Sequence, residues 1–93
     1  MAAAKAYVYL VRCRDGTFYT GTARDVAKRL AQHDAGKGAK YTRSRGPVQL
    51  LWSEGPMTVS RALRREHQLK QLTRAQKQAL VAGTLTLRLP RRR

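Results

Sequence analysis

Apolar and polar positions along this chain alternate with two different periods, which separate expected strands from expected helices. Two apolar segments rich in aromatic and β-branched residues, 6–13 and 18–22, flank an Asp15-Gly16 pair. Asp-Gly between such segments is a strong hairpin signal, so we expect two antiparallel strands joined by a tight turn. A third strand is expected at 48–52, where a Gly55-Pro56 turn follows it.

Three further segments carry the longer spacing of amphipathic helices. Asp25 opens the first, because a carboxylate is favourable at a helix N terminus, and this helix ends near residue 35. Thr58 or Ser60 caps the second, which ends near residue 72. Thr73 begins a capping-box pattern for the third, which ends near residue 83.

The resulting order, β-β-α-β-α-α, predicts an α/β (α+β) fold with a small, mainly antiparallel three-stranded sheet flanked by helices. A chain of 93 residues has room for one hydrophobic core and not for two. We therefore expect an N-terminal tail at 1–5, a single domain at 6–83 and a basic C-terminal tail at 84–93.

The net charge of the chain indicates what kind of partner it binds. Twenty Lys and Arg residues face five acidic residues, which gives a formal net charge of +15. Such a balance indicates a polyanionic partner, and nucleic acid is the simplest one. We expect DNA, while RNA stays open, and a ribosome-associated protein is a further alternative.

The composition also bears on compartment. The single cysteine, Cys13, cannot form an intrachain disulfide. No apolar run approaches the roughly 18 residues of a membrane span, and residues 1–5 are too few for a signal peptide. We expect a cytoplasmic monomer that does not enter a membrane.

The first candidate chemical groups lie on the hairpin and on the helix after it. Tyr9 and Tyr19 should face each other directly or diagonally on one side of the sheet, although both could simply pack the sheet. Arg29 and His33 are four residues apart, hence on one helix face near Tyr19, at the edge of the apolar stripe. A solvated arginine and a histidine favoured by the helix dipole are the plainer alternatives. The expected stripe comprises Val26, Ala27, Leu30 and Ala31.

The second helix contributes one acid at an unusual position. Glu66 lies among its apolar positions, which are Val59, Ala62, Leu63 and Leu69, whereas Arg64 and Arg65 should point elsewhere. A buried carboxylate needs a partner, which could be a distant arginine, a metal ion, or both. Mg²⁺ often takes only one or two carboxylates together with waters and substrate phosphate. The other acids are scattered, so a single-metal site is favoured over a two-metal site.

Five segments in order carry a resemblance to a known family. They are Tyr7-Val8-Tyr9, Tyr19-Thr20-Gly21, and the stretches DVAKRLAQH, GKGAKYTR and ALRREHQLK. Together they resemble the GIY-YIG nuclease superfamily, in particular its small single-domain bacterial UPF0213 or YhbQ-like branch. The resemblance extends from about residue 6 to residue 80. Tyr7 stands in place of the first glycine of that pattern, and Thr20 in place of its isoleucine.

The resemblance implies a metal-dependent DNA endonuclease, with structure-selective cutting in DNA repair or recombination as an expected role. Glu66 would bind one Mg²⁺ or Mn²⁺, and Arg29 would contact the scissile phosphate. Tyr9 or His33 would accept the proton of the attacking water, Tyr19 would orient water or phosphate, and neighbouring cations would lower the pKa of Tyr9. The nucleic-acid contacts would come from Lys28, Lys37, Lys40, Tyr41, Arg43 and Arg45. A protein partner for substrate targeting is compatible with this view, and a non-catalytic nucleic-acid-binding module is the alternative.

Overall fold

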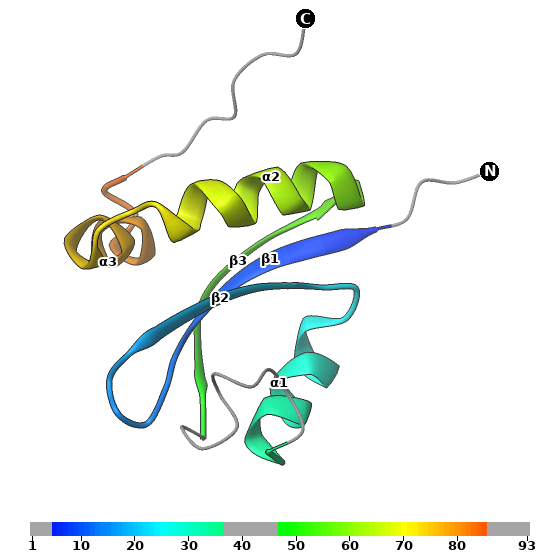
Figure 1. Ribbon diagram of the computed structural model, residues 1–93, viewed down its shortest axis with the longest axis horizontal. Coiled ribbons are helices and arrows are strands. Elements are labelled where there is room, and N and C mark those ends of the chain that lie inside the picture. Colours follow the sequence, from blue (N-terminus) through cyan, green and yellow to red (C-terminus); the bar gives the residue numbers. More distant parts are fainter. Residues whose placement is uncertain (1–4, 37–46, 86–93) are drawn as a thin grey trace, which may run out of the picture.

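The computed structural model describes residues 5–36 and 47–85, and within them the strands and helices follow the predicted order (Figure 1). The α/β fold with a small antiparallel sheet is therefore confirmed. The elements are β1 (Ala6–Arg12), β2 (Phe18–Ala23), α1 (Val26–Asp34), β3 (Gln49–Met57), α2 (Val59–Lys70) and α3 (Arg74–Ala82).

The three strands form one antiparallel sheet in the order β2-β1-β3, so β1 is central. The turn between β1 and β2 is built as predicted: Gly16 has a φ of +87°, and its amide donates to the carbonyl of Cys13 at 2.9 Å. The Asp15 carboxylate accepts the amide of Thr17 at 3.0 Å. The hairpin places β2 at the edge of the sheet, where its outer side is open.

Strand β3 differs from the prediction, because Gly55-Pro56 lies inside it and not in a turn. The pairing of β1 with β3 shifts at this point, between Ala6 and Val8. Gly55 has a φ of +146°, and a Cβ there would lie 2.6 Å from Cδ2 of Tyr7. The two residues thus mark an irregularity within an edge strand, which is the other place where glycine and proline are tolerated in sheets.

The helix starts were well predicted. Asp25 accepts the amide of Lys28 at 3.1 Å, and Thr58 accepts the amide of Arg61 at 3.2 Å. Thr73 forms the full capping box at the start of α3. These caps satisfy amide groups that would otherwise lack a partner at each N terminus.

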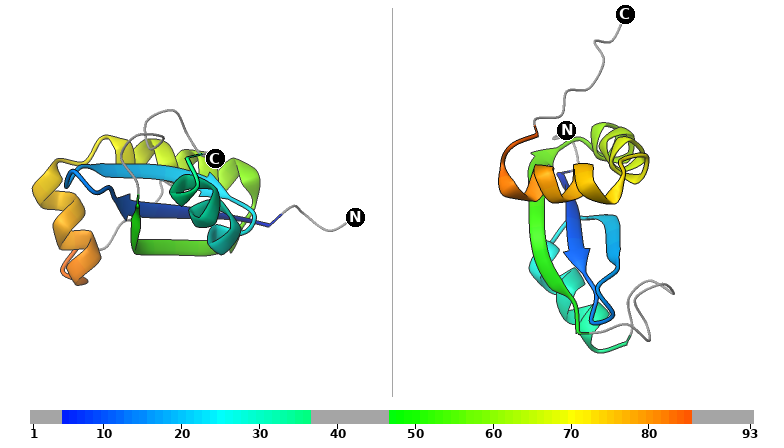
Figure 2. Two further views of the ribbon diagram at one scale, coloured as in Figure 1. Left: turned by 90° about the horizontal axis from the view of Figure 1, so that it is seen from below. Right: turned by 90° about the vertical axis from the view of Figure 1, so that its left-hand side faces the viewer.

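Helices lie on both sides of the strands, with α2 and α3 on one side and α1 on the other (Figures 1 and 2). The core cluster joins Ala6 and Val8 of β1 to Ala62 and Leu69 of α2 and Leu80 of α3. Within the described ranges, no helix has the length and hydropathy that crossing a membrane requires.

The apolar stripe expected on α1 is only partly right. Val26 and Leu30 are half-buried, but Ala27 and Ala31 are exposed. His33 is the buried residue of this helix. Helix α1 is therefore anchored through His33, with Val26 and Leu30 partly buried beside it, and not through its alanines.

Candidate active site

The two hairpin tyrosines lie diagonally on one side of the sheet, one of the two arrangements predicted. Tyr9 is paired with Gly21 across the hairpin, and Tyr19 is paired with Val11. The centroids of the two phenol rings are 6.4 Å apart, at an interplanar angle of 46°. Tyr9 is fully buried. A fixed pair of phenols therefore lies on one face of the sheet.

Gly21 makes this arrangement possible because it leaves space for the ring of Tyr9. A Cβ at position 21 would lie 2.5 Å from Oη and 2.7 Å from Cζ of Tyr9. It would also lie 3.1 Å from Cε2 of Tyr19. No side chain larger than hydrogen fits without moving the phenol of Tyr9, which accounts for the glycine at the third position of the second triplet.

His33 lies against both tyrosines. Its Nε2 is 2.8 Å from Oη of Tyr9, and the imidazole is fully buried. The ring centroid of His33 is 5.9 Å from that of Tyr9 and 5.5 Å from that of Tyr19, at interplanar angles of 65° and 66°. The sequence placed His33 at the edge of the buried surface of α1, and the structure places it at the centre of a three-ring cluster.

Burial keeps the imidazole neutral. Removal from water lowers the pKa of His33 below its usual value, and the nearby Arg29 guanidinium lowers it further, while Asp34 acts in the opposite direction. At neutral pH the imidazole is thus uncharged, and its Nε2 accepts from or donates to the Tyr9 hydroxyl according to the ring tautomer.

The environment of Tyr9 differs from the sequence-based expectation. Burial raises the pKa of Tyr9 above 10.0, and the neighbouring Tyr19 and Glu66 raise it further. Arg29 opposes these effects without reversing them. The expected lowering by a nearby cation is present in Arg29, but loss of hydration outweighs it, so the pKa of Tyr9 is raised overall. Tyr9 is a neutral phenol that needs an acceptor for its proton, and His33 is in contact with it.

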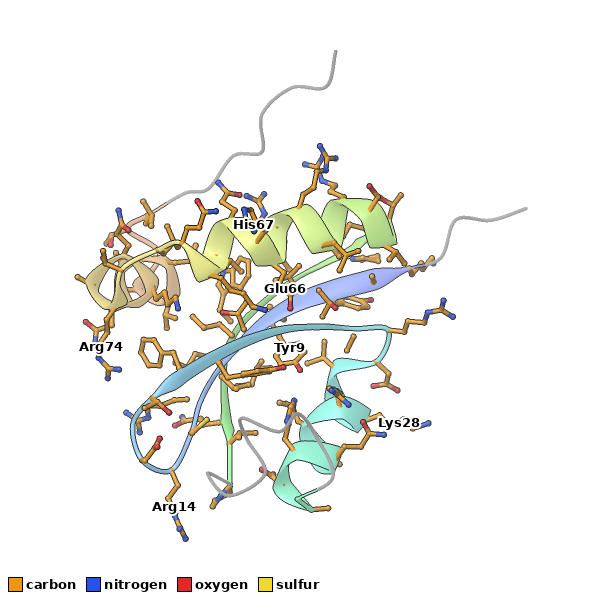
Figure 3. All side chains as sticks on the ribbon, viewed as in Figure 1. Tyr9, Arg14, Lys28, Glu66, His67 and Arg74 are labelled. Carbon is orange, nitrogen blue, oxygen red and sulfur yellow. The ribbon has the colours of Figure 1, made fainter. Side chains whose placement is uncertain are left out.

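Arg29 lies on the side of α1 that faces an open groove of about 360 Å³. The groove is lined by the end of β2 and by the exposed side of α1, including Arg24, Lys28 and Gln32. Gln32 accepts a hydrogen bond from Nη1 of Arg29 at 3.1 Å, which holds the guanidinium in place. Lys28 extends outward from α1 (Figure 3). Three cationic side chains and one carboxylate, that of Asp25, thus line this groove.

Glu66 points from α2 toward the strands (Figure 3). Its side chain is 19% exposed, and one carboxylate oxygen lies 3.5 Å from Nζ of Lys70, whose side chain is 57% exposed. The prediction that Glu66 is half-withdrawn from water is right, although Leu63 in the same expected stripe is an exposed residue.

Arg65 is the residue that sequence reasoning misplaced. It was expected to point away from the core, but it is buried, and its Nε lies 2.7 Å from Oε1 of Glu54 on β3. Its Nη1 donates to Gln68 at 2.8 Å. The helical spacing contained the signal, since Arg65 lies three residues after Ala62 and four before Leu69, both of which are buried. This ion pair fastens α2, and with it Glu66, to the sheet.

The described acidic residues do not form a metal-binding cluster. Among residues 5–36 and 47–85, no group of three or more His, Cys, Asp or Glu side chains could hold a metal ion. A single half-buried carboxylate still fits a hard divalent ion, because such ions retain waters and take further oxygen ligands from a phosphate. Glu66 is the residue that matches this description.

The basic loop expected to grip nucleic acid cannot be compared with the structure. Its residues Lys37, Lys40, Tyr41, Arg43 and Arg45 lie outside the described residues. Of the nucleic-acid-binding residues predicted from the sequence, Lys28 is the one placed in the groove.

Comparison with known proteins agrees with this geometry. The chain matches the family model described as the GIY-YIG catalytic domain over residues 5–79. It is 55% identical over 74 residues to a UPF0213 protein of Halobacterium salinarum, which covers 80% of this chain and 96% of that relative. It is 47% identical over 78 residues to a UPF0213 protein of Staphylococcus saprophyticus, covering 84% of this chain and 95% of that relative.

Two solved structures are also similar. The solution structure of a UPF0213 protein from Bacillus halodurans shares 43% identity at a TM-score of 0.56, over 85% of this chain and 84% of that chain. A solution structure of a protein from E. faecalis shares 37% identity at a TM-score of 0.57, over 95% of both chains. The family model covers both tyrosine triplets and Gly21, and the relatives match most of the chain. The chain therefore belongs to the GIY-YIG nuclease superfamily, in its group of UPF0213 proteins.

Proposed function

We propose that this protein is a metal-dependent DNA endonuclease whose active site is formed by Tyr9, Tyr19, Arg29, His33 and Glu66. The observation that carries the proposal is the 2.8 Å contact between Oη of Tyr9 and Nε2 of a neutral, buried His33. Any buried tyrosine hydroxyl needs a hydrogen-bond partner; this contact differs in that Tyr19 lies against both rings and Arg29 acts on the pKa of both groups.

The proposed proton path follows from this contact. Tyr9 donates its phenolic proton to Nε2 of His33 while its oxygen takes a proton from the attacking water. The path avoids a free phenolate, which the raised pKa of Tyr9 makes costly. It also gives both residues a part, where the sequence left Tyr9 and His33 as alternatives. Tyr19 orients the water or the phosphate from the neighbouring position.

The charged side chains near the three rings have separate roles in the proposed reaction. Arg29 neutralises charge that develops on the scissile phosphate, since its guanidinium is held by Gln32 at the groove. Lys28 contacts a flanking phosphate. Glu66 would hold one Mg²⁺ or Mn²⁺, which when bound stabilises the leaving oxygen as a Lewis acid.

The wider setting is also part of the proposal. A net charge of +15 and the cationic groove support a nucleic-acid substrate, with DNA preferred on the family match. We propose a monomeric enzyme of the cytoplasm that acts in DNA repair or recombination, with a protein partner as one route to substrate targeting. The loop at 37–46 would supply further phosphate contacts.

The test is a cleavage assay with the whole chain. Labelled single-stranded, duplex, flapped and four-way-junction DNA and a single-stranded RNA are incubated with Mg²⁺ or Mn²⁺, and with EDTA as control. We expect metal-dependent cutting of DNA that leaves 5′-phosphate and 3′-hydroxyl ends. The alternative, a non-catalytic binding module, predicts salt-sensitive binding of the same DNA without turnover in any metal.

A further inference from the structure

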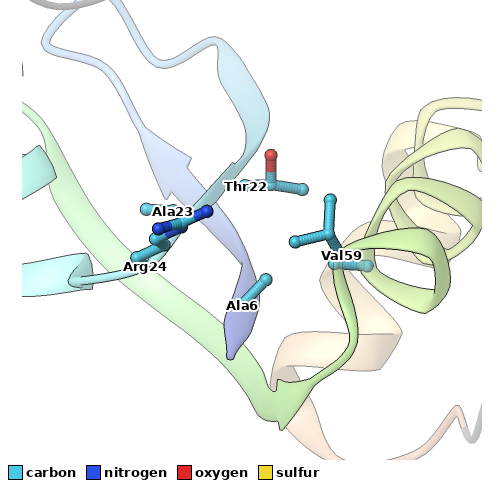
Figure 4. A pocket seen from close by; sticks show the side chains of 6 residues that line it. Ala6, Thr22, Ala23, Arg24 and Val59 are labelled. Carbon is cyan, nitrogen blue, oxygen red and sulfur yellow. The ribbon is translucent and has the colours of Figure 1, made fainter. Parts of the chain in front are cut away.

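A second, smaller pocket adjoins the candidate active site and has a different character from the cationic groove. It measures about 270 Å³ and lies between the end of β2, the start of β1 and the first turn of α2 (Figure 4). Its lining comprises Ala6, Thr22, Ala23, Arg24, Val59 and Ala62. Figure 4 shows Thr22 and Val59 on opposite walls of the opening.

The pocket adjoins the candidate active site through α2 and through Arg24. Thr22 is paired with Val8, so its side chain lies on the α2 side of the sheet, opposite to Tyr9. Ala62 precedes Glu66 by one helical turn on the same face of α2, and one turn corresponds to about 5.4 Å along the helix axis. A group in the pocket is therefore within one nucleotide of a phosphate that lies at Glu66.

The chemistry of the lining suits a flat ring that carries polar edges. Four of the six side chains are alanine or valine, which present apolar surface, and the Thr22 hydroxyl can both donate and accept a hydrogen bond. Arg24 lies between this pocket and the cationic groove, because it lines both. Its planar guanidinium can stack on a base or contact the adjoining phosphate.

Size and charge limit the occupant further. Pockets for drug-sized ligands measure roughly 300–1,000 Å³, so a pocket just below this range suits a single ring system. Beside a strongly positive surface the partner is a polyanion, and nucleic acid is the polyanion that carries such rings.

We propose that the pocket lined by Thr22, Arg24 and Val59 binds one unpaired nucleobase of the substrate, adjacent to the scissile phosphate. The inference rests on the proposed nuclease function and adds the class of substrate. A base that enters the pocket lies between β2 and α2, turned away from a complementary strand. The protein therefore acts on single-stranded DNA or on the single-stranded arm of a fork or flap, in preference to continuous duplex.

The pocket can be blocked without touching the core. Val59 is 40% exposed at the rim, so Val59→Trp fills the opening from a position that tolerates a larger side chain. Leu63→Trp is the matched control, because Leu63 lies on the same helix, is 52% exposed and does not line the pocket. The thermal midpoint of both variants is measured to confirm that each is folded.

Binding is measured separately from cleavage, so that the two proposals can fail independently. All binding variants carry Glu66→Ala and are kept in EDTA, and the probe is a labelled forked DNA with one abasic site moved along its single-stranded arm. Removing the base that enters the pocket should weaken binding about tenfold at one position of the arm, as for a buried base in single-strand binding. Val59→Trp should weaken binding of the intact fork by a similar factor and remove this position dependence, whereas Leu63→Trp should retain it.

Other outcomes are equally informative. A uniform response to abasic sites, or a Val59→Trp protein that binds the fork as tightly as its parent, would overturn the base pocket. If the base pocket is overturned in this way but the wild-type protein still cuts DNA, the nuclease proposal stands without the base pocket. If binding depends on the position of the abasic site but the wild-type protein cuts no DNA, the base pocket is supported and the nuclease proposal is refuted.

Discussion

Replacement of Gly21 by alanine adds a single methyl group at the most crowded point of the candidate site. That methyl would lie 2.5 Å from Oη and 2.7 Å from Cζ of Tyr9, where an ordinary contact is 3.4 Å or longer. Tyr9 is fully buried, so its ring has no open space to enter. To relieve the contact, the phenol must move by about 1 Å, which is enough to break its 2.8 Å hydrogen bond with His33.

The expected cost has two parts. Overpacking of a buried site typically costs about 1–3 kcal/mol, and a lost hydrogen bond costs about 1 kcal/mol more. We therefore expect Gly21→Ala to lower the free energy of unfolding by about 2–4 kcal/mol. For a domain of this size, each kcal/mol lowers the thermal midpoint by roughly 4–8 °C. Cleavage should fall by about a hundredfold, because a displacement near 1 Å misaligns reacting groups.

The assay is urea denaturation of Gly21→Ala alone and in a Tyr9→Phe background, together with the cleavage rate. Tyr9→Phe removes the oxygen that makes the 2.5 Å contact, so the same alanine should cost less in that background. A Gly21→Ala protein within about 0.5 kcal/mol of wild type, the usual range for a surface change, would refute the placement of Tyr9 over Gly21.

Two further predictions concern buried charges. Because the pKa of His33 is lowered in the folded protein, the unfolded chain binds the extra proton first. The free energy of unfolding should therefore rise with pH from the lowered pKa of His33 up to about 6.5, at no more than about 1.4 kcal/mol per pH unit. Urea denaturation at several pH values measures this rise, and the His33→Gln protein should lack it. Glu54→Gln leaves the buried Arg65 without a counter-charge and should cost roughly 3 kcal/mol. Arg65→Met leaves a carboxylate whose side chain is 38% exposed and should cost less by the same measurement; equal losses would contradict the asymmetry.

Much of the fold followed from local signals in the sequence. The Asp15-Gly16 turn and the caps at Asp25 and Thr73 depend on short-range backbone geometry, so residue type alone identifies them. Gly55-Pro56 was misjudged because the same two residues mark a turn or a strand irregularity, and the pairing of β3 with β1 decides between them.

The candidate site could be predicted less completely. Helical spacing showed that Glu66 is withdrawn from water, and it also set Arg65 between Ala62 and Leu69, but it could not show that this arginine meets a counter-charge on the sheet. That depends on Glu54, which only the sheet register brings beneath α2. The depth of His33 was likewise invisible, because histidine at a helix end is usually solvated, and only the tertiary structure brings the ring against Tyr9 and Tyr19. The burial of Tyr9 was equally hidden, so the sequence could not show that the pKa of its phenol is raised.

The cleavage rate of Glu66→Ala, set beside that of Lys70→Ala, tests the central claim most directly. Lys70 is the ion-pair partner of Glu66, so its removal leaves the carboxylate in place. With forked DNA and Mg²⁺, the account predicts that Glu66→Ala binds DNA but does not cut it, whereas Lys70→Ala cuts within a few-fold of wild type. Equal cutting by wild type and Glu66→Ala would show that this carboxylate, and the active site proposed around it, does not hydrolyse DNA.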